Sequence, residues 1–190
     1  MRRPKILIGG AAVLVVLVVG ITQLGGTAPT SGGKAPTLSA AQRELAGSPP
    51  PLDALHHKAN ALLPGSQLAG AIKALHGYPI VVNAWGSWCT PCRQEFPIFQ
   101  RLSAQLGRRV AFLGLDVQDA AGDARSFLAD HPVTYPSYQD FDKAIFTSYG
   151  LLGAPSTIFY DRQGRKVFLH SGVYTRAADL RANIKRYAGA

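Results

Sequence analysis

Cysteine is scarce in this chain: the 190 residues contain only two, Cys89 and Cys92. So few cysteines exclude a framework of several disulfides, and they exclude a zinc site built from two cysteine pairs. Lysine and arginine form no run of five or more, although the formal net charge is +9. Because nucleic-acid-binding domains gather basic residues on one face, this scatter argues against nucleic acid as a partner.

Acidic residues are absent from the first 37 positions, which carry four basic residues: Arg2, Arg3, Lys5 and Lys34. The rest of the chain therefore holds 16 basic and 11 acidic residues, which is only mildly basic. A long uncharged stretch follows the first basic residues and reaches 21 residues at positions 6–26. About 20 helical residues span a bilayer core, so we predict a transmembrane anchor at 6–26, with residues 1–5 in the cytoplasm.

A cleaved signal peptide is the alternative interpretation of this stretch. Its best small-residue cleavage site, at residues 26–28, is followed by Pro29, which is a poor context, so we favour an uncut anchor. No cysteine follows the apolar run, and lipoprotein anchoring is therefore excluded. Residues 27–51 are rich in Gly, Pro, Ser and Thr and are predicted as a flexible linker that contains one short helix capped by Ser39. The folded domain is predicted at 52–190.

Hydrophobic periodicity predicts alternating helices and strands after the linker. The expected helices lie at 40–46, 52–63, 68–75, 91–106, 123–130, 141–149 and 176–187. The expected strands lie at 80–85, 110–117, 134–138, 157–160 and 166–169. A turn at 161–164 joins the last two strands as an antiparallel hairpin. The pattern predicts an α/β fold around a central mixed sheet, parallel at first and antiparallel at its end.

The two cysteines form a C-x-x-C pair directly after the predicted strand at 80–85. A zinc site would need further ligands, but no second pair exists and the five histidines show no H-x3–5-H spacing. A structural disulfide across so short a loop would remove little entropy from the unfolded chain. Redox chemistry is the interpretation that suits a pair placed between a strand and a helix.

A cysteine at a helix N-terminus favours its thiolate form, because unpaired backbone N–H groups and the helix dipole stabilise negative charge. Cys89 is therefore predicted to be the exposed, acidic nucleophile. Cys92, one turn further, is predicted to be the resolving thiol. Pro91 fits the first turn of that helix, where a backbone N–H has no partner to lose.

The motif Trp88-Cys89-Thr90-Pro91-Cys92 after a buried strand resembles that of the thioredoxin fold. More narrowly, it resembles the membrane-anchored TlpA/ResA-like disulfide reductases of bacteria. Their pattern V-V-N-x-W-x-x-W-C-x-P-C-x-x-E-x-P is matched at residues 81–97, and residues 153–157 (GAPST) match their cis-proline loop. The resemblance covers 68–190. It implies a thioredoxin-like α/β fold with an inserted helix-strand unit at 123–138.

The resemblance also implies roles for single residues. Pro155 is expected to be cis and, with Ala154, to bind a substrate strand beside the cysteines, although an ordinary trans proline in a turn is the alternative. Trp88 is expected to shield the sulfurs and to contact substrate. Pro97 is expected to kink the active-site helix, because an interior proline has no backbone N–H. Trp85 fits the site or the core, and we favour the core.

Two positions depart from ordinary thioredoxin. Asn83 stands where thioredoxin has a buried aspartate, and an amide cannot accept a proton. The TlpA/ResA-like proteins carry a glutamate three positions after the second cysteine, and Glu95 stands there. Burial would raise the pKa of this carboxyl group, so Glu95 is the candidate acid/base for Cys92, with a solvated helix glutamate as the alternative.

Three functions remain open on the sequence. The first is an extracytoplasmic protein disulfide reductase in the bacterial cell membrane, supplied with electrons by a membrane protein and possessing no cofactor or metal. Its substrates would include the haem-binding cysteines of apocytochrome c, as in some relatives. The second is an oxidase that forms disulfides in secreted proteins, since direction depends on redox potential. The third is a copper-binding module. The absence of a histidine near Pro155 in the sequence argues against this function.

Overall fold

The computed structural model describes residues 36–189. The predicted cytoplasmic segment at 1–5 and the predicted anchor at 6–26 lie outside the described residues. Between residues 36 and 189, none of the helices combines the length and the apolar character that crossing a bilayer requires.

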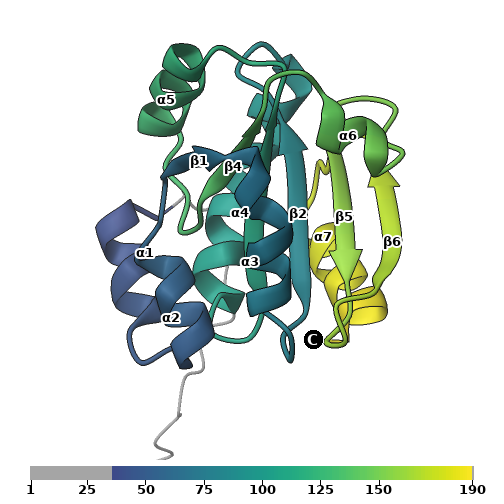
Figure 1. Ribbon diagram of the computed structural model, residues 1–190. Helices are drawn as coiled ribbons and strands as arrows, with labels where there is room; N and C mark the ends of the chain where they lie inside the picture. The colour runs from purple at the N-terminus through teal and green to yellow at the C-terminus, as the bar shows by residue number, and fades with distance from the viewer. Residues whose placement is uncertain (1–35, 190) are drawn as a thin grey trace, which may run out of the picture. The chain divides into compact units, whose positions relative to one another are not determined.

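Two helices open the described part of the chain, helices and strands then alternate, and two consecutive strands precede the last helix (Figure 1). The strands are β1 (Leu62–Pro64), β2 (Ile80–Trp85), β3 (Ala111–Val117), β4 (Ser137–Asp140), β5 (Ser156–Tyr160) and β6 (Lys166–Ser171). The α-helices are α1 (Leu38–Leu45), α2 (Pro50–His56), α3 (Leu68–Ala74), α4 (Thr90–Leu106), α5 (Ala121–Asp130), α6 (Ala144–Ser148) and α7 (Ala177–Asn183). A short 3-10 helix η1 (Gly65–Gln67) precedes α3, and a π-helical turn η2 (Ile184–Ala188) follows α7.

The described strands form one sheet in the order β1-β4-β3-β2-β5-β6. The first four strands are parallel, whereas β5 and β6 run antiparallel to their neighbours. The prediction of a mixed sheet that changes direction at its end is therefore confirmed. It could be made because the turn signal at 161–164 marks a hairpin by purely local chemistry.

Strand β2 is buried along its whole length, because helices cover both faces of the sheet. Successive side chains of a strand point to opposite faces. Val81 and Trp85 enter the core beneath α4, α5 and α7. The alternate residues enter the core beneath α2, α3 and α6: Ile80, Val82 and Ala84.

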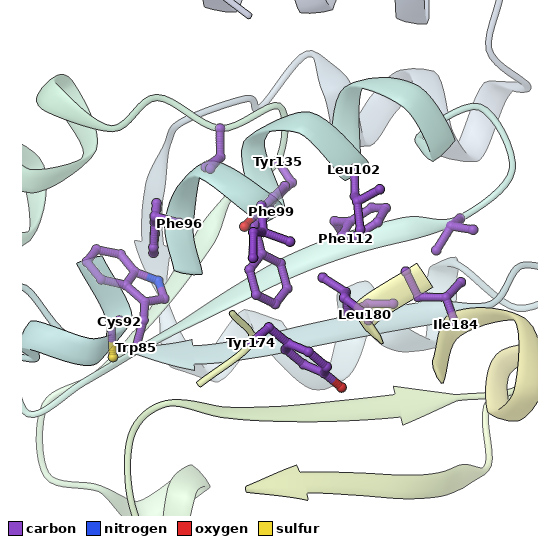
Figure 2. Packing of buried hydrophobic residues seen from close by; sticks show 14 of the residues in the cluster. Trp85, Cys92, Phe96, Phe99, Leu102, Phe112, Tyr135, Tyr174, Leu180 and Ile184 are labelled. Carbon is purple, nitrogen blue, oxygen red and sulfur yellow. The ribbon is translucent and has the colours of Figure 1, made fainter. Parts of the chain in front are cut away.

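Aromatic side chains fill the core on the α4 face of the sheet (Figure 2). The Trp85 ring stacks on Phe127 from α5, with 4.9 Å between ring centroids, and meets the edge of Phe96 from α4 at 5.2 Å. Each large apolar side chain buried in this way stabilises the fold by roughly 1.5–3 kcal/mol. The packing fixes the start of α4 against the end of β2, which is where the cysteines lie.

The helix predicted at 52–63 is wrong in its second half, because α2 ends at His56 and β1 occupies Leu62–Pro64. Asn60 adopts a left-handed conformation with φ 61°, which a helix does not allow. Its side-chain amide donates to Leu128 O at 3.0 Å, and its Oδ1 accepts the Val133 N–H at 3.1 Å. These partners lie some 70 positions away along the chain, so local periodicity does not reveal the break.

Helix α1 lies within the segment predicted as a linker that contains one short helix, and its residues Ala41 and Leu45 are buried. Thr37, rather than Ser39, caps this helix by accepting the Ala40 N–H at 3.3 Å. Leu45 is only 2% exposed, and its side chain lies against Gly107 at the end of α4. The other predicted elements are confirmed, with ends that differ by up to three residues, except that α7 ends at Asn183 and the rest of the helix predicted at 176–187 is the π-helical turn η2.

Truncation of Leu45 measures how firmly α1 belongs to the domain. Leu45→Ala is expected to lower the free energy of unfolding by about 2–5 kcal/mol, the usual cost of removing a buried leucine side chain. Urea denaturation of the full chain, followed by near-UV circular dichroism, measures the change. Gln42→Ala, on the exposed face of α1, is the matched control. Equal stability of both variants would mean that α1 is not part of the packed domain.

Candidate functional site

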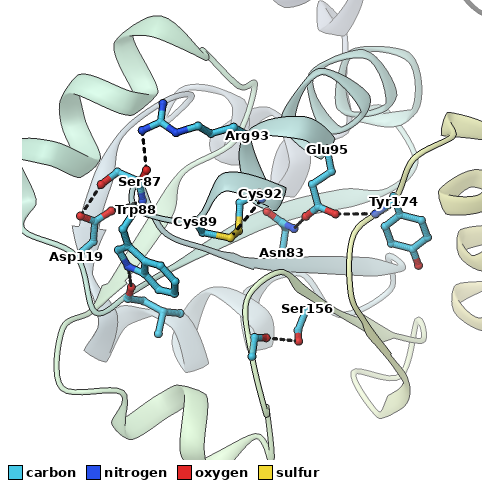
Figure 3. Close-up of a disulfide and its surroundings, with 12 residues drawn as sticks. Asn83, Ser87, Trp88, Cys89, Cys92, Arg93, Glu95, Asp119, Ser156 and Tyr174 are labelled. Carbon is cyan, nitrogen blue, oxygen red and sulfur yellow. Dashed lines mark hydrogen bonds between the residues drawn. A yellow bond between two sulfur atoms is a disulfide. The ribbon is translucent and has the colours of Figure 1, made fainter.

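The two cysteines lie at the junction between the end of β2 and the start of α4, and they are joined by a disulfide (Figure 3). The S–S distance is 2.01 Å. Cys89 is the N-cap residue of α4, and its Sγ accepts the backbone N–H of Cys92 at 3.2 Å. The sequence predicts a sulfur at the N-terminus of this helix, close to a free backbone N–H group. The structure places Cys89 Sγ at that position.

Cys89 is not exposed as predicted. It is 2% exposed and belongs to the buried cluster on the α4 face, and Ala154 packs against that cluster. Cys92, the residue to which it is bonded, is fully buried as well. In the disulfide form, a partner must therefore displace covering groups before it reaches Cys89.

Two prolines lie in α4 as the sequence predicts. Pro91 occupies the first turn, and Pro97 lies inside the helix. Because Pro97 has no backbone N–H, it cannot donate to the carbonyl oxygen of Arg93. The predicted kink at this point stays a prediction.

The peptide bond between Ala154 and Pro155 is cis. Pro155 immediately precedes β5, whose first residue Ser156 pairs with Ala84 near the end of β2. Because β5 runs antiparallel to β2, its beginning lies beside the end of β2, from which the cysteine turn departs. The Pro155 loop and the cysteines, more than sixty positions apart in the chain, therefore lie at the same end of adjacent strands.

Glu95 is fully buried, so the alternative of a solvated helix glutamate does not hold. Its Oε1 accepts the Asn83 side-chain N–H at 2.7 Å, and its Oε2 accepts the backbone N–H of Tyr174 at 2.9 Å (Figure 3). Burial raises the pKa of Glu95 to about 7, and the two hydrogen bonds lower it in part. Glu95 lies three positions after Cys92, which places both on one face of α4.

The two tryptophans have different environments. Trp88 is 54% exposed, and its indole N–H donates to Val117 O at 3.0 Å. Trp85 is fully buried, and its indole N–H donates to Ser137 Oγ at 3.2 Å. The favoured placement of Trp85 in the core is confirmed, whereas Trp88 offers apolar surface next to the disulfide.

Sequence reasoning missed the groups that hold the turn before Cys89. Asp119 accepts the backbone N–H of Ser87 at 2.5 Å and the Ser87 hydroxyl at 2.8 Å. The Arg93 guanidinium donates to Ser87 O at 2.6 Å (Figure 3). No motif marks Asp119, because it lies 32 positions after Ser87 and meets it only through the pairing of β3 with β2.

Among residues 36–189, no three His, Cys, Asp or Glu side chains converge as metal ligands.

Comparison with known proteins relates this arrangement to a group of redox proteins. Residues 67–167 match the AhpC/TSA family. The chain is 34% identical over 118 residues to a thiol:disulfide interchange protein DsbE homolog of Paracoccus denitrificans, covering 61% of this chain and 63% of that protein. It is 25% identical over 104 residues to the thiol-disulfide oxidoreductase ResA of Bacillus subtilis, covering 54% of this chain and 58% of that protein.

A solved structure shares the same arrangement of helices and strands. It is a candidate thiol:disulfide interchange protein DsbE from Chlorobium tepidum, with a TM-score of 0.54 and 29% sequence identity. The match covers 63% of this chain and 84% of that one. In contrast, this chain spans less than two thirds of the length of the curated relatives named above.

Proposed function

The chain belongs to the AhpC/TSA family and has a thioredoxin-like α/β fold, and from this premise we propose that it is a protein thiol:disulfide oxidoreductase. One observation carries the proposal: the Cys89–Cys92 disulfide caps the N-terminus of α4 one turn before a buried, hydrogen-bonded Glu95. A disulfide with a purely structural role would need neither a helix N–H group bound to its sulfur nor a nearby acid with a raised pKa.

In the reducing direction, the proposed cycle begins with the dithiol form. The Cys89 thiolate attacks one sulfur of a substrate disulfide, so that a bond forms between Cys89 Sγ and that sulfur while the substrate S–S bond breaks. The leaving substrate thiolate takes a proton. The Cys92 N–H that Cys89 Sγ accepts in the disulfide form stabilises negative charge on the same sulfur before the attack.

Cys92 then completes the transfer. Its thiol loses a proton to the Glu95 carboxylate, and the resulting thiolate attacks Cys89 Sγ. The mixed disulfide breaks, the second substrate thiolate leaves, and the protein holds the Cys89–Cys92 disulfide. Two electrons have then passed to the substrate. A pKa of about 7 suits Glu95 to this work, because a general base is most effective when its pKa lies near the operating pH.

We assign substrate binding to the surface around the disulfide. Trp88 contributes exposed apolar area beside Cys89, and the backbone at Ala154 and Pro155 is the proposed pairing site for an extended substrate segment. Pro155 O already accepts the Gly172 N–H at 3.0 Å, which fixes one side of the loop.

The proposal places the domain outside the cytoplasm of a bacterium, anchored by residues 6–26 and reduced by a membrane protein. Supporting it are the uncharged stretch behind Arg2, Arg3 and Lys5 and the sequence identity to thiol:disulfide interchange proteins. We propose disulfides of extracytoplasmic proteins as substrates, among them the haem-binding cysteines of apocytochrome c.

The redox potential decides the direction. The full chain in detergent is equilibrated with glutathione buffers, and the fluorescence of Trp88 beside the disulfide reports the fraction reduced. The Thr90-Pro91 dipeptide favours reduction, so we expect a potential nearer to that of thioredoxin, about −270 mV, than to that of a strong oxidant such as DsbA, about −120 mV. A variant with serine at both cysteines is the control, since its fluorescence must not respond. A potential near −120 mV would instead support the oxidase.

A further inference from the structure

Asp116 is a fully buried acid that the proposed redox cycle does not use. It lies in β3 between Trp85 of β2 and Gln139 of β4, with which it is paired in register, and it is 0% exposed. Neither of its carboxylate oxygens has a hydrogen-bond partner among the described residues. A buried charge without a partner is very costly, so the environment of Asp116 requires an explanation.

The side chain that meets Asp116 is another acid, Asp119, which is 3% exposed. Both oxygens of Asp119 are occupied by Ser87, through its backbone N–H and its hydroxyl. Ser87 is in turn held by Arg93, and the next residue, Trp88, donates to Val117 O. Asp119 therefore connects the end of β3 to the turn that leads into Cys89.

Two carboxyl groups in contact at a buried site repel each other when both are ionised, so one of them keeps its proton to higher pH. Both oxygens of Asp119 already accept hydrogen bonds from Ser87, whereas neither oxygen of Asp116 has a donor, so the proton belongs to Asp116. Burial first, and then the charge of Asp119, raise the pKa of Asp116 to about 8. A protonated carboxyl group has one O–H to donate, and the acceptor that it meets is Asp119.

The other groups around this pair do not neutralise it. Gln139 of β4 lies against Asp116 and lowers its pKa only in part, and Trp85 of β2 has no charge. From α4, the Arg93 guanidinium is directed to Ser87 O at 2.6 Å. His131 of α5 lies near Arg93, and both its burial and this cation lower its pKa. The proton on Asp116 therefore removes the repulsion between the carboxylates of Asp116 and Asp119.

We propose that protonated Asp116 is a positioning residue, which holds Asp119 and through it the Ser87–Trp88 turn in front of Cys89. When Asp116 gives its proton to the solvent, two adjacent buried negative charges face each other. Asp119 then moves away from Asp116 and releases one or both of its bonds to Ser87. The turn loosens, and Cys89 is presented less well to its partners. The activity consequence rests on the proposed redox function, whereas the movement of the turn does not.

The disulfide form of the protein allows a clean test, because its cysteines do not titrate. The NMR signal of the Trp88 indole N–H is followed in the oxidised full chain from pH 6 to pH 10. We expect a chemical-shift change with a midpoint near 8. Asp116→Asn is the decisive variant, because its amide donates to Asp119 at every pH, and it should show no such change. Glu95→Gln should retain the change, which separates it from the titration of Glu95.

Equal pH responses of the wild type and Asp116→Asn would overturn the proposal, as would a wild-type signal that does not move. If Asp116→Asn fails to fold, infrared spectroscopy of the Glu95→Gln protein gives the answer. A carbonyl band of a protonated carboxylic acid must be present at pH 7 and disappear above pH 8. Its absence at pH 7 contradicts the proposal.

Activity supplies the second measurement. The rate of insulin reduction, corrected for the thiolate fraction of Cys89, should fall severalfold between pH 7 and pH 9 in the wild type and should not fall in Asp116→Asn. If neither protein reduces insulin but the indole signal behaves as expected, the proposed function fails and the positioning role of Asp116 stands. A parallel fall in both proteins would contradict that role.

Discussion

Replacement of Cys92 by serine is expected to stop the reaction after its first step and to leave Cys89 joined to substrate by a lasting disulfide. Cys89 can still attack a substrate disulfide, because its place at the N-cap of α4 does not depend on the sulfur of residue 92. Serine cannot form the second S–S bond, so nothing resolves the mixed disulfide. Cys89→Ser is expected to form no covalent complex at all. Insulin reduction by either variant should fall to the rate of uncatalysed exchange.

The trapped species is measured by incubating the reduced variants with insulin and separating the products without reductant. Mass spectrometry then identifies the sulfur atoms that are joined. Serine replaces a fully buried cysteine at position 92, so near-UV circular dichroism must first show a native fold. The two variants serve as controls for each other. Equal trapping by both would contradict the assignment of Cys89 as the nucleophile and Cys92 as the resolving thiol.

Replacement of Glu95 by glutamine is expected to slow the resolving step and to remove its dependence on pH around 7. General acid–base catalysis typically contributes about 10²–10⁴-fold to a rate, and an amide cannot take the proton from Cys92. The glutamine retains the shape of the side chain, and Asn83 can rotate its amide so that its unpartnered Oδ1 accepts from the new N–H. The loss is therefore chemical rather than structural.

The same substitution is expected to stabilise the protein at alkaline pH. The pKa of Glu95 is raised from 4.5 to about 7 in the folded state, so between these pH values the folded chain binds a proton that the unfolded chain has lost. The wild type therefore loses stability as pH rises from 4.5 to 7 and loses no more above that window. Glu95→Gln has no such slope, and we expect it to exceed the wild type by about 1–3 kcal/mol at pH 8.

Urea denaturation of the oxidised proteins at pH 5 and pH 8 measures this difference, and stopped-flow mixing of the reduced proteins with a disulfide peptide measures the rate. Glu44→Gln, an exposed glutamate of α1, is the matched control and should change neither quantity. An unchanged pH profile of the thiol reaction in Glu95→Gln would remove Glu95 from the mechanism, whatever its effect on stability.

The redox pair and its setting could be predicted because the signals lie within one short segment. A buried strand, a tryptophan, two cysteines and a first-turn proline follow one another at residues 80–92, and each constrains its neighbours locally. The same holds for the hairpin at 157–169, whose turn residues mark it. Asn83 and Glu95 share that segment, and their direct hydrogen bond accounts for the co-occurrence of an amide and an acid at these positions.

What could not be predicted depends on contacts between distant parts of the chain. Asn60 adopts its left-handed conformation where its side chain bonds to Leu128 and Val133, and Leu62 pairs with Ser137 in an edge strand. Asp119 looks like an ordinary polar residue of a loop until β3 brings it to Ser87. The exposure of Cys89 was predicted from the chemistry of a reactive thiol, whereas the disulfide form holds its sulfur within a packed core.

The backbone N–H of Tyr174 that binds Glu95 comes from a segment 79 positions later in the chain. During synthesis, the cysteine pair therefore emerges long before the amide that completes the site of its acid. The Pro155 loop also emerges after the cysteines. A nascent or truncated chain that ends before residue 155 contains both thiols but lacks the proposed substrate-pairing backbone and the second hydrogen bond to the acid. The redox centre is in this sense assembled last, when the C-terminal part of the chain reaches its place.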